Sequence, residues 1–439
     1  MDSVAFYTLG CKVNHYETEA MIDKFINKGY QIKDFDQKAD IYIINSCTVT
    51  NQAASKSRKY ARRAKRRNRD AIVVMVGCYP QVDENEVIDI EEIDYIMGTS
   101  GKSDIVKLIE ENIDNNSSDK HLKNNIKYED FSEFEEMSIK DLSETTRAYI
   151  KIQEGCNQFC SYCIIPYARG KMRSRDPQNI IKEVRNLIKE DNVKEVVLTG
   201  IHLGAYGIEQ DDKYALVHLI EKLAKIDGLK RIRLSSIEVT EVNDKLLNLM
   251  KNNEKICPHL HLPLQSGSNK ILDRMNRPYT KEEFKEKVNK FKKAVPDLAI
   301  TTDVIVGFPG EGIKEFRETY NFVKNIGFSR LHVFPFSRRK NTPAYDMKPR
   351  VRGDIKSKNS SRLRFLNKRL MANFNKKYIG KIKKIIIEDN TDYKTGLNTG
   401  YTDNYIKVLV DANQEDIEKL KDVKLTECHD YEAIKGNIL

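Results

Sequence analysis

The 439-residue sequence lacks the apolar segments that membrane targeting requires. Its first ten residues, MDSVAFYTLG, contain no basic stretch followed by an apolar run, so they do not read as a signal peptide. The most apolar run, AIVVMVGCY, is far too short to cross a bilayer. We therefore expect a cytoplasmic protein with no membrane partner.

Cysteine is also scarce, with eight in the whole chain. A reducing cytosol disfavours a disulfide framework, and isolated cysteines are usually small buried hydrophobes, as we expect for Cys257 and Cys428. The remaining six need another explanation: Cys11, Cys47, Cys78, Cys156, Cys160 and Cys163.

The length and charge of the chain limit its organisation. A chain of 439 residues is too long for one compact core, so we expect two to four domains. Its 40% hydrophobic and 32% charged residues fit a globular protein, and a formal net charge of +10 raises the odds of a polyanionic partner.

The first hundred residues alternate strand and helix. Strands are predicted at 4–9, 41–45 and 71–76, with helices at 16–29 and 51–68, an order typical of a doubly wound parallel sheet. Each predicted strand is followed, after one small residue, by a cysteine: Cys11, Cys47 and Cys78.

The carboxyl ends of parallel strands share one edge, where such folds bind their ligands. These three cysteines would therefore meet at one point. Three unrelated buried cysteines remain an alternative, but three strand ends out of three favour convergence on a metal.

A second α/β region follows a polar segment with little periodicity. Six strands with helices between them predict a partial, six-stranded relative of the (β/α)₈ barrel, with its chemistry at the carboxyl ends of the strands. These strands are 148–153, 195–200, 231–236, 259–265, 300–308 and 330–336.

A charged helix at 353–378 leads into short strands that predict a small all-β barrel. We place the domains at 1–113, 142–372 and 375–438, with a linker at 114–141.

The stretch EGCNQFCSYCIIPYARG carries three cysteines on one short loop: Cys156, Cys160 and Cys163. Zinc usually has four protein ligands in paired knuckles, but this loop has no histidine and no second knuckle follows it. Three thiolates can instead hold a [4Fe–4S] cluster with one iron left open for a small ligand.

The C-x₃-C-x₂-C spacing, with Tyr162 before the last cysteine, resembles the radical S-adenosylmethionine superfamily. The resemblance implies that the open iron binds S-adenosylmethionine and that an electron from the cluster cleaves it to a deoxyadenosyl radical. It also makes other strand ends candidate contacts of that cosubstrate, although each fits an ordinary βα turn as well. These candidates are Thr199, Gly200, Ser235, Glu238, Gln265 and Gly307.

Two three-cysteine sites and a C-terminal β-barrel resemble the methylthiotransferases of this superfamily, whose barrel is an RNA-binding TRAM domain. Motifs along nearly the whole chain carry the resemblance, among them TLGCKVN, INSCTVTN, VLTGIHLGAYG, HLHLPLQSGS and DVIVGFPGE. TLGCKVN and NSCTVTN look like the branch that modifies N6-threonylcarbamoyladenosine in tRNA. The isopentenyladenosine branch tends to TYGCQMN, and the branch acting on a ribosomal-protein aspartate to SLGCPKN.

The resemblance implies two [4Fe–4S] clusters and two S-adenosylmethionine molecules per turnover. One molecule would methylate a sulfur species at the cluster of Cys11, Cys47 and Cys78. The other would yield the radical that takes hydrogen from adenine C2, a C–H bond with no acidic proton for a general base. The implied partners are the tRNA anticodon loop, a sulfur donor, and an electron donor such as a flavodoxin or ferredoxin system.

Two basic segments are candidates for phosphate contact, although a charge run is often only a solvated face. The first is the helix after Cys47, for which we predict an inward stripe of Ala53, Ser57, Tyr60 and Ala64; the second runs over 338–377. Tyr393, Tyr401 and Tyr405 are candidates for base stacking or for the barrel core, and His259 and His261 for structural roles. The basic side chains of the first segment are Lys56, Arg58, Lys59, Arg62, Arg63, Lys65, Arg66, Arg67 and Arg69.

The sequence thus predicts a tRNA methylthiotransferase acting on the adenosine 3′ of the anticodon, at position 37. A methylthiotransferase acting on isopentenyladenosine or on a ribosomal protein remains an alternative. A non-catalytic RNA-binding protein with a structural zinc or iron–sulfur site is a third hypothesis.

Overall fold

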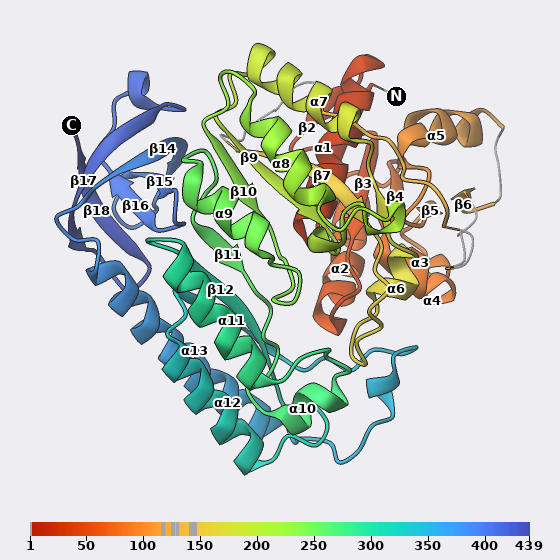
Figure 1. Cartoon of the computed structure of the whole chain (residues 1–439). Helices are drawn as coiled ribbons and strands as arrows, with labels where there is room; N and C mark the ends of the chain where they lie inside the picture. Colours follow the sequence, from red (N-terminus) through yellow and green to blue (C-terminus); the bar gives the residue numbers. More distant parts are fainter. Residues whose placement is uncertain (1, 116–118, 124–127, 129–130, 140–146) are drawn as a thin grey trace.

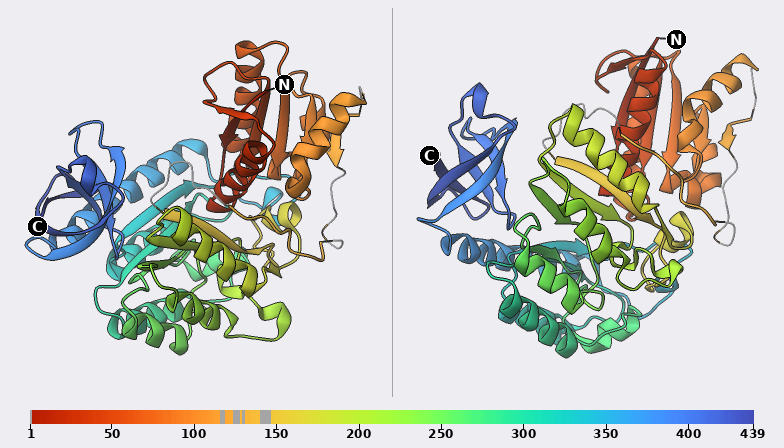
Figure 2. Two further views of the ribbon diagram at one scale, coloured as in Figure 1. Left: turned by 90° about the horizontal axis from the view of Figure 1, so that it is seen from above. Right: turned by 45° about the horizontal axis from the view of Figure 1, so that its top comes forward.

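The structure, a computed structural model, describes residues 2–115, 119–123, 128, 131–139 and 147–439. A parallel sheet and a small β-barrel lie at opposite sides of the molecule, with a six-stranded core between them (Figures 1 and 2). No helix within the described residues has the length and apolarity needed to cross a membrane.

The N-terminal sheet is parallel throughout, in the order β2-β1-β3-β4-β5-β6. Strands β3 and β4 are almost entirely buried because helices cover both faces, which explains their continuous apolar runs. The predicted doubly wound sheet is confirmed. Its strands are β1 (Ser3–Thr8), β2 (Gln31–Lys33), β3 (Ile41–Ser46), β4 (Ile72–Gly77), β5 (Tyr95–Met97) and β6 (His121–Lys123). Its helices are α1 (Lys12–Asn27), α2 (Asn51–Arg67), α3 (Cys78–Val82), α4 (Glu84–Ile88) and α5 (Ile105–Asp114).

The buried stripe of α2 differs from the predicted one. Ser57 and Ala64 are buried as expected, but Ala54 and Ala61 complete the stripe in place of Ala53 and Tyr60. Tyr60 lies on the flank of the helix, where its ring stacks on Tyr7 at 3.3 Å between centroids. Small residues let α2 approach the sheet closely, and the tyrosine covers its edge.

Part of the predicted linker is ordered. Strand β6 extends the N-terminal sheet, and Phe131, Met137 and Ile139 are buried against the two domains. These apolar residues are too widely spaced to produce a periodic pattern. The rest of the predicted linker lies outside the described residues: 116–118, 124–127, 129–130 and 140–141.

The core contains the six predicted parallel strands and a short antiparallel strand, β8, in two sheets of order β10-β9-β7-β8 and β11-β12-β13. An isolated bridge between Ser236 and His261 joins the sheets into a partial barrel. Helix α1 packs on β7 and β9. The strands are β7 (Arg147–Glu154), β8 (Arg173–Ser174), β9 (Glu195–Gly200), β10 (Arg231–Leu234), β11 (His259–His261), β12 (Ala299–Val306) and β13 (Arg330–Pro335). The helices are α6 (Ile165–Arg169), α7 (Pro177–Glu190), α8 (Ala215–Ala224), α9 (Asp244–Asn252), α10 (Asn269–Arg274), α11 (Lys281–Ala294), α12 (Ile313–Ile326) and α13 (Gly353–Lys376).

The C-terminal strands close into the predicted small barrel, in the order β14-β15-β16-β18-β17. Its core is aliphatic, with Ile385, Val408 and Val423 fully buried. The strands are β14 (Ile382–Thr391), β15 (Asn398–Thr402), β16 (Lys407–Val410), β17 (Leu420–Cys428) and β18 (Ala433–Ile438).

The turn between β15 and β16 docks this small barrel onto the amino-terminal ends of the core strands. Tyr405 lies 4.8 Å from the His259 ring on β11 and 4.6 Å from the Arg233 guanidinium on β10. Arg233 also donates to the carbonyl oxygens of Thr402 and Asp403, at 3.2 and 2.8 Å. A charged hydrogen-bond network therefore fixes the orientation of the two domains.

Candidate functional site: two cysteine trios joined by an arginine

The first cysteine trio lies at the carboxyl edge of the N-terminal sheet. Strands β1, β3 and β4 are neighbours in register there, with Thr8 beside Asn45 and Ser46 beside Gly77. The residues that follow these strands, Cys11, Cys47 and Cys78, are thereby brought together as the sequence predicts.

Backbone geometry allows this approach. Gly10 has φ +112°, and a Cβ added there would lie 3.2 Å from the Cys47 sulfur, so a side chain next to Cys11 would crowd the site. Burial, followed by the nearby thiols of Cys78 and Cys11, raises the pKa of Cys47 to about 12. Cys47 and Cys78 are buried, whereas Cys11 is exposed.

The second trio lies on the loop that follows β7. Gln158 links two of its sulfurs, because its backbone N–H lies 3.4 Å from Cys156 Sγ and its side-chain oxygen 3.8 Å from Cys160 Sγ. Burial raises the pKa of Cys163 to about 12, with further contributions from Cys160 and Cys156. The loop therefore gathers all three sulfurs.

Each trio receives a hydrogen bond from a buried guanidinium. Arg277 Nη1 lies 3.3 Å from Cys160 Sγ, and Arg169 Nε lies 3.3 Å from Cys78 Sγ. Donors of this kind stabilise negative charge on sulfur, which is the form that binds iron. Two sets of three soft donors, each supported by a cation, fit two iron–sulfur clusters with one iron of each open.

The six predicted cosubstrate contacts lie at the carboxyl ends of the core strands, on the same side as the second trio. Ser235 Oγ is buried and has no hydrogen-bond partner among the described residues, which fits a group that a ligand completes. Glu238 is held by Arg277. Gly307 has φ +77° and donates its N–H to Glu311 at 2.8 Å. Thr199, Gly200 and Gln265 close the remaining strand ends.

Arg169 connects the two cysteine trios. It ends α6, just after the second trio, and besides Cys78 it contacts Asn14 at 2.6 Å and Glu17 at 2.5 Å on α1. It also pairs with Glu154, the last residue of β7. One fully buried side chain thus touches a ligand of one site and the strand that carries the other.

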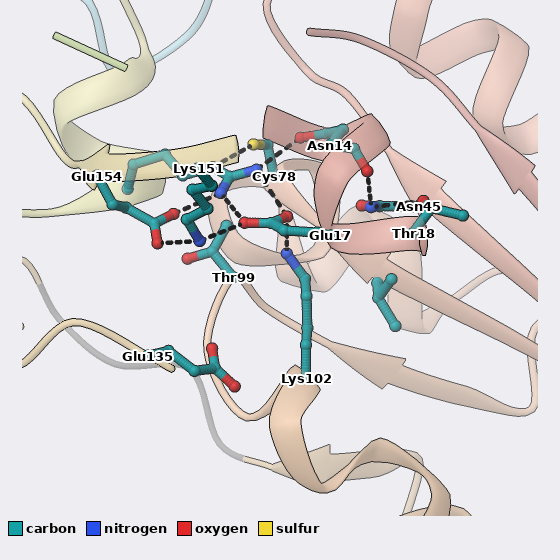
Figure 3. Close-up of polar contacts among 12 residues, drawn as sticks. Asn14, Glu17, Thr18, Asn45, Cys78, Thr99, Lys102, Glu135, Lys151 and Glu154 are labelled. Carbon is teal, nitrogen blue, oxygen red and sulfur yellow. Dashed lines mark hydrogen bonds and ion pairs between the residues drawn. The ribbon is translucent and has the colours of Figure 1, made fainter. Parts of the chain in front are cut away.

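Glu17 is at the centre of this buried network (Figure 3). Its carboxylate accepts from Lys102 Nζ at 2.5 Å and from Lys151 Nζ at 2.9 Å, in addition to Arg169. Burial alone would raise the pKa of Glu17, but Arg169, Lys102 and Lys151 outweigh it and hold the pKa well below its usual range. The interface between the N-terminal domain and the core is therefore ionic at its most buried point.

The basic helix α2 is more neutralised than its sequence indicates. Five of its eight basic side chains form ion pairs with acidic residues of the N-terminal domain. These pairs are Arg58 with Glu86, Arg62 with Glu92, Arg63 and Arg67 with Asp36, and Lys65 with Asp94. For these five side chains the ion pairs favour a structural role at the protein surface over contact with phosphates.

A polar pocket of roughly 270 Å³ lies between α2 and the loop after β13. Arg58, Arg338 and Lys340 line it, and Arg339 beside them pairs with Asp83 and contacts Thr48, next to Cys47. The two predicted basic segments thus meet beside the first trio.

Two of the three tyrosines proposed for base stacking are engaged within the protein, which contradicts that role for them. Tyr401 lies 4.7 Å from the Arg147 guanidinium, and Tyr405 fills the domain interface already described. Tyr393 remains 88% exposed. Domain docking requires aromatic contacts that single-sequence patterns cannot distinguish from RNA contacts.

Sequence reasoning missed the two arginines that contact sulfur. Arg169 is in the quoted YARG motif, and Arg277 follows α10, but nothing in either local pattern indicates burial. Its position shortly after Cys163 in the sequence is the signal that could have marked Arg169 as a functional residue.

Three family comparisons match successive parts of the chain. Residues 3–98 match the uncharacterized protein family UPF0004, residues 150–323 the radical SAM superfamily, and residues 376–434 the TRAM domain. Among solved structures, the radical S-adenosylmethionine methyltransferase TsrM from Kitasatospora setae superposes with a TM-score of 0.57 at 12% identity, covering 79% of this chain and 77% of that one. That likeness concerns the fold.

Curated relatives match over the full length. Threonylcarbamoyladenosine tRNA methylthiotransferase MtaB of Bacillus subtilis (strain 168) is 44% identical over 97% of this chain and 94% of its own, and the MtaB of Aquifex aeolicus (strain VF5) is 42% identical over 94% and 97%. A tRNA-2-methylthio-N(6)-dimethylallyladenosine synthase of Clostridium tetani (strain Massachusetts / E88) is 34% identical over 95% and 92%. The chain therefore belongs to the radical SAM tRNA methylthiotransferases, in the branch of the MtaB proteins.

Proposed function

We propose that this protein is a tRNA methylthiotransferase that acts at C2 of N6-threonylcarbamoyladenosine, at position 37 beside the anticodon. The product is 2-methylthio-N6-threonylcarbamoyladenosine. The observation that carries the proposal is the pairing of two three-cysteine sites across one domain interface, linked by Arg169. Family membership selects the threonylcarbamoyl branch over the isopentenyl and ribosomal-protein alternatives.

The two trios would each hold a [4Fe–4S] cluster. Cys156, Cys160 and Cys163 would hold the one that binds S-adenosylmethionine, and Cys11, Cys47 and Cys78 the auxiliary one. When bound, the clusters and S-adenosylmethionine supply the radical chemistry that an unactivated aromatic C–H bond requires. S-adenosylmethionine would be contacted by Thr199, Gly200, Ser235, Glu238, Gln265 and Gly307.

The protein's own contribution is electrostatic and positional. Arg277 and Arg169 stabilise the thiolates of Cys160 and Cys78 through hydrogen bonds of 3.3 Å each. The Glu17 network fixes α1, and with it Cys11, against the core. A buried ionic interface therefore holds the two cysteine trios in fixed positions relative to each other.

We assign residues 1–113 to the auxiliary-cluster domain, 142–372 to the radical core and 375–438 to the TRAM domain. The anticodon loop would approach the side on which the basic segments 51–69 and 338–340 meet beside Cys47. The enzyme would work in the cytoplasm with a sulfur donor and with an electron donor of the flavodoxin or ferredoxin type.

The test is turnover by the protein reconstituted anaerobically with iron and sulfide. Incubated with S-adenosylmethionine, a reductant and tRNA carrying N6-threonylcarbamoyladenosine, it should yield the methylthio nucleoside on mass spectrometry of the digested tRNA. Cys160→Ala should yield none. Equal turnover on tRNA that carries isopentenyladenosine, or none on the threonylcarbamoyl substrate, would refute the assignment.

A further inference from the structure

One lysine beside the first cysteine trio forms no ion pair with any described residue. Lys12 directly follows Cys11 and begins α1, and its ammonium lies 5.9 Å from the centre of the Tyr149 ring on β7. Among the described residues Lys12 Nζ forms no hydrogen bond or ion pair, and the Tyr149 ring is its cation–π partner. A half-buried cation without a counterion is unusual, because a lysine with access to water normally extends into it.

The surroundings of Lys12 are the inner residues of the core barrel. Its charge interacts with Tyr405, Arg233, Arg147 and Glu195 at the base of the barrel, and also with His259 of β11 and His332 of β13, on the strands across the barrel from β7. Lys12 thus reaches from the N-terminal domain into the interior of the barrel.

A polar cluster lies on those strands: His261, Asp303 and His332. Their ligand atoms are all within 4.8 Å of one another, and His261 Nε2 is 3.2 Å from Asp303 Oδ1. The side chains of His261 and Asp303 are 16% and 26% exposed to solvent. Solvent, and hence a ligand, can reach this part of the barrel.

Two histidines and a carboxylate could also suit a divalent metal, but their electrostatic environment opposes one. At the base of the barrel three arginines, Arg147, Arg231 and Arg233, face two carboxylates, Glu195 and Glu388. Lys12 adds an unpaired positive charge nearby. Burial first, and then His261, Arg330 and Lys12 in that order, lower the pKa of His332 to about 4, even though Asp303 acts in the opposite direction. The interior favours an anion over a second cation.

The curated relatives differ in one relevant respect, the N6 substituent of their nucleoside. The threonylcarbamoyl group carries a carboxylate, a hydroxyl and a ureido group, whereas the dimethylallyl group is an apolar hydrocarbon. A buried cation beside hydrogen-bonding side chains is complementary to the first and would be left unsatisfied by the second.

We propose that Lys12 binds the carboxylate of the threonylcarbamoyl group, while His332 and Asp303 hydrogen-bond its hydroxyl and ureido groups. This assignment rests on the proposed function and extends it, because it makes Lys12 the residue that distinguishes a threonylcarbamoyl from an isopentenyl substrate. Since Lys12 adjoins Cys11, the same contact would hold the adenine next to the auxiliary site.

The test is a chemical double-mutant cycle on binding. A fluorescent anticodon stem-loop carrying N6-threonylcarbamoyladenosine is compared with its methyl ester, which removes the negative charge and keeps the rest. The dissociation constants of both are measured by anisotropy for the cluster-reconstituted wild type and for Lys12→Met. Lys28→Met, which removes an exposed lysine at the end of the same helix, is the matched control.

We expect esterification to weaken wild-type binding by about ten- to a hundred-fold, the size of a lost hydrogen bond between charged groups. Lys12→Met should weaken binding of the acid by a similar factor and should bind acid and ester equally, whereas Lys28→Met should behave as wild type. Lys12→Arg should recover most of the discrimination. Iron content should stay at the wild-type level, which excludes damage to the site of Cys11.

If Lys12→Met still prefers the acid as strongly as the wild type does, the proposal is wrong. The same holds if the wild type binds acid and ester equally. Failure of the proposed function is a separate result: the wild type would then bind these stem-loops without methylthiolating them, and the comparison of acid with ester would still decide the role of Lys12.

Discussion

The buried carboxylate of Glu17 gives the most direct test of how the two cysteine sites are held together. Glu17→Gln keeps the size and shape of the side chain and removes its charge. Lys151 and Arg169 would then keep one carboxylate, that of Glu154, and Lys102 would lose the carboxylate it pairs with; all four side chains are at most 2% exposed.

The expected cost follows from this burial. Breaking a buried ion pair by removing one partner destabilises a protein by about 3–5 kcal/mol, since it leaves charge uncompensated in a low dielectric. That is a large part of the roughly 5–15 kcal/mol that stabilises a typical domain. The effect should be local to the interface of α1 with β7.

Hydrogen exchange measured by mass spectrometry on the reconstituted protein resolves this interface. Protection of the α1 amides should fall by about two to four orders of magnitude in Glu17→Gln, the factor that corresponds to this free energy. The matched control is Glu111→Gln, whose partner Lys107 lies 3.7 Å away with 72% of its side chain exposed, and which should change protection by less than about two-fold. Protection of α1 that is equal in the two variants would refute the assignment of the network as the domain clamp.

Three further outcomes are expected. Burial raises the pKa of Glu195, but Arg233, Arg231 and Arg147 outweigh it and lower the pKa to about 2, so this group contributes stability above its unfolded pKa of about 4.5 and loses it as the pH falls towards 2. The stability gap between wild type and Glu195→Gln, on the order of 3 kcal/mol at pH 7 in urea unfolding, should therefore shrink between pH 4.5 and 2; a constant gap would contradict the pairing. Cys160→Ala should abolish deoxyadenosine formation while retaining about half of the iron, and a variant that still cleaves S-adenosylmethionine would overturn the role of the second trio. Affinity for tRNA should fall steeply with added salt, because phosphate contacts release counterions, and binding that ignores salt would remove the basic segments from the interface.

The sequence predicts the fold well because its strong signals are local. Strand β9 (Glu195–Gly200) coincides with its prediction, and the cysteine that follows each of β1, β3 and β4 locates one site from strand order alone. Contacts between domains leave no such local pattern. Neither the burial of Arg169 nor the direction of Lys12 follows from the neighbouring residues, since both depend on how α1 packs against β7.

The same reason explains the errors in the predictions. Tyr405 is an aromatic residue of the type that stacks on RNA bases, but it lies in a domain interface. The charge of α2 is offset by acidic residues distant in sequence, such as Asp36 and Glu86. Tyr60 was expected to face inward, yet close helix packing selects alanine instead.

The docking of Tyr405 and its neighbours has a consequence for truncated proteins. The turn before β16 contacts Arg147, Arg233 and His259 and covers the amino-terminal end of the barrel in which a carbon-centred radical would form. Deleting the C-terminal domain would therefore do more than weaken RNA binding. It would expose the amino-terminal end of the barrel to bulk water and solutes, and unproductive quenching of the radical would rise even with a substrate that needs no RNA-binding domain.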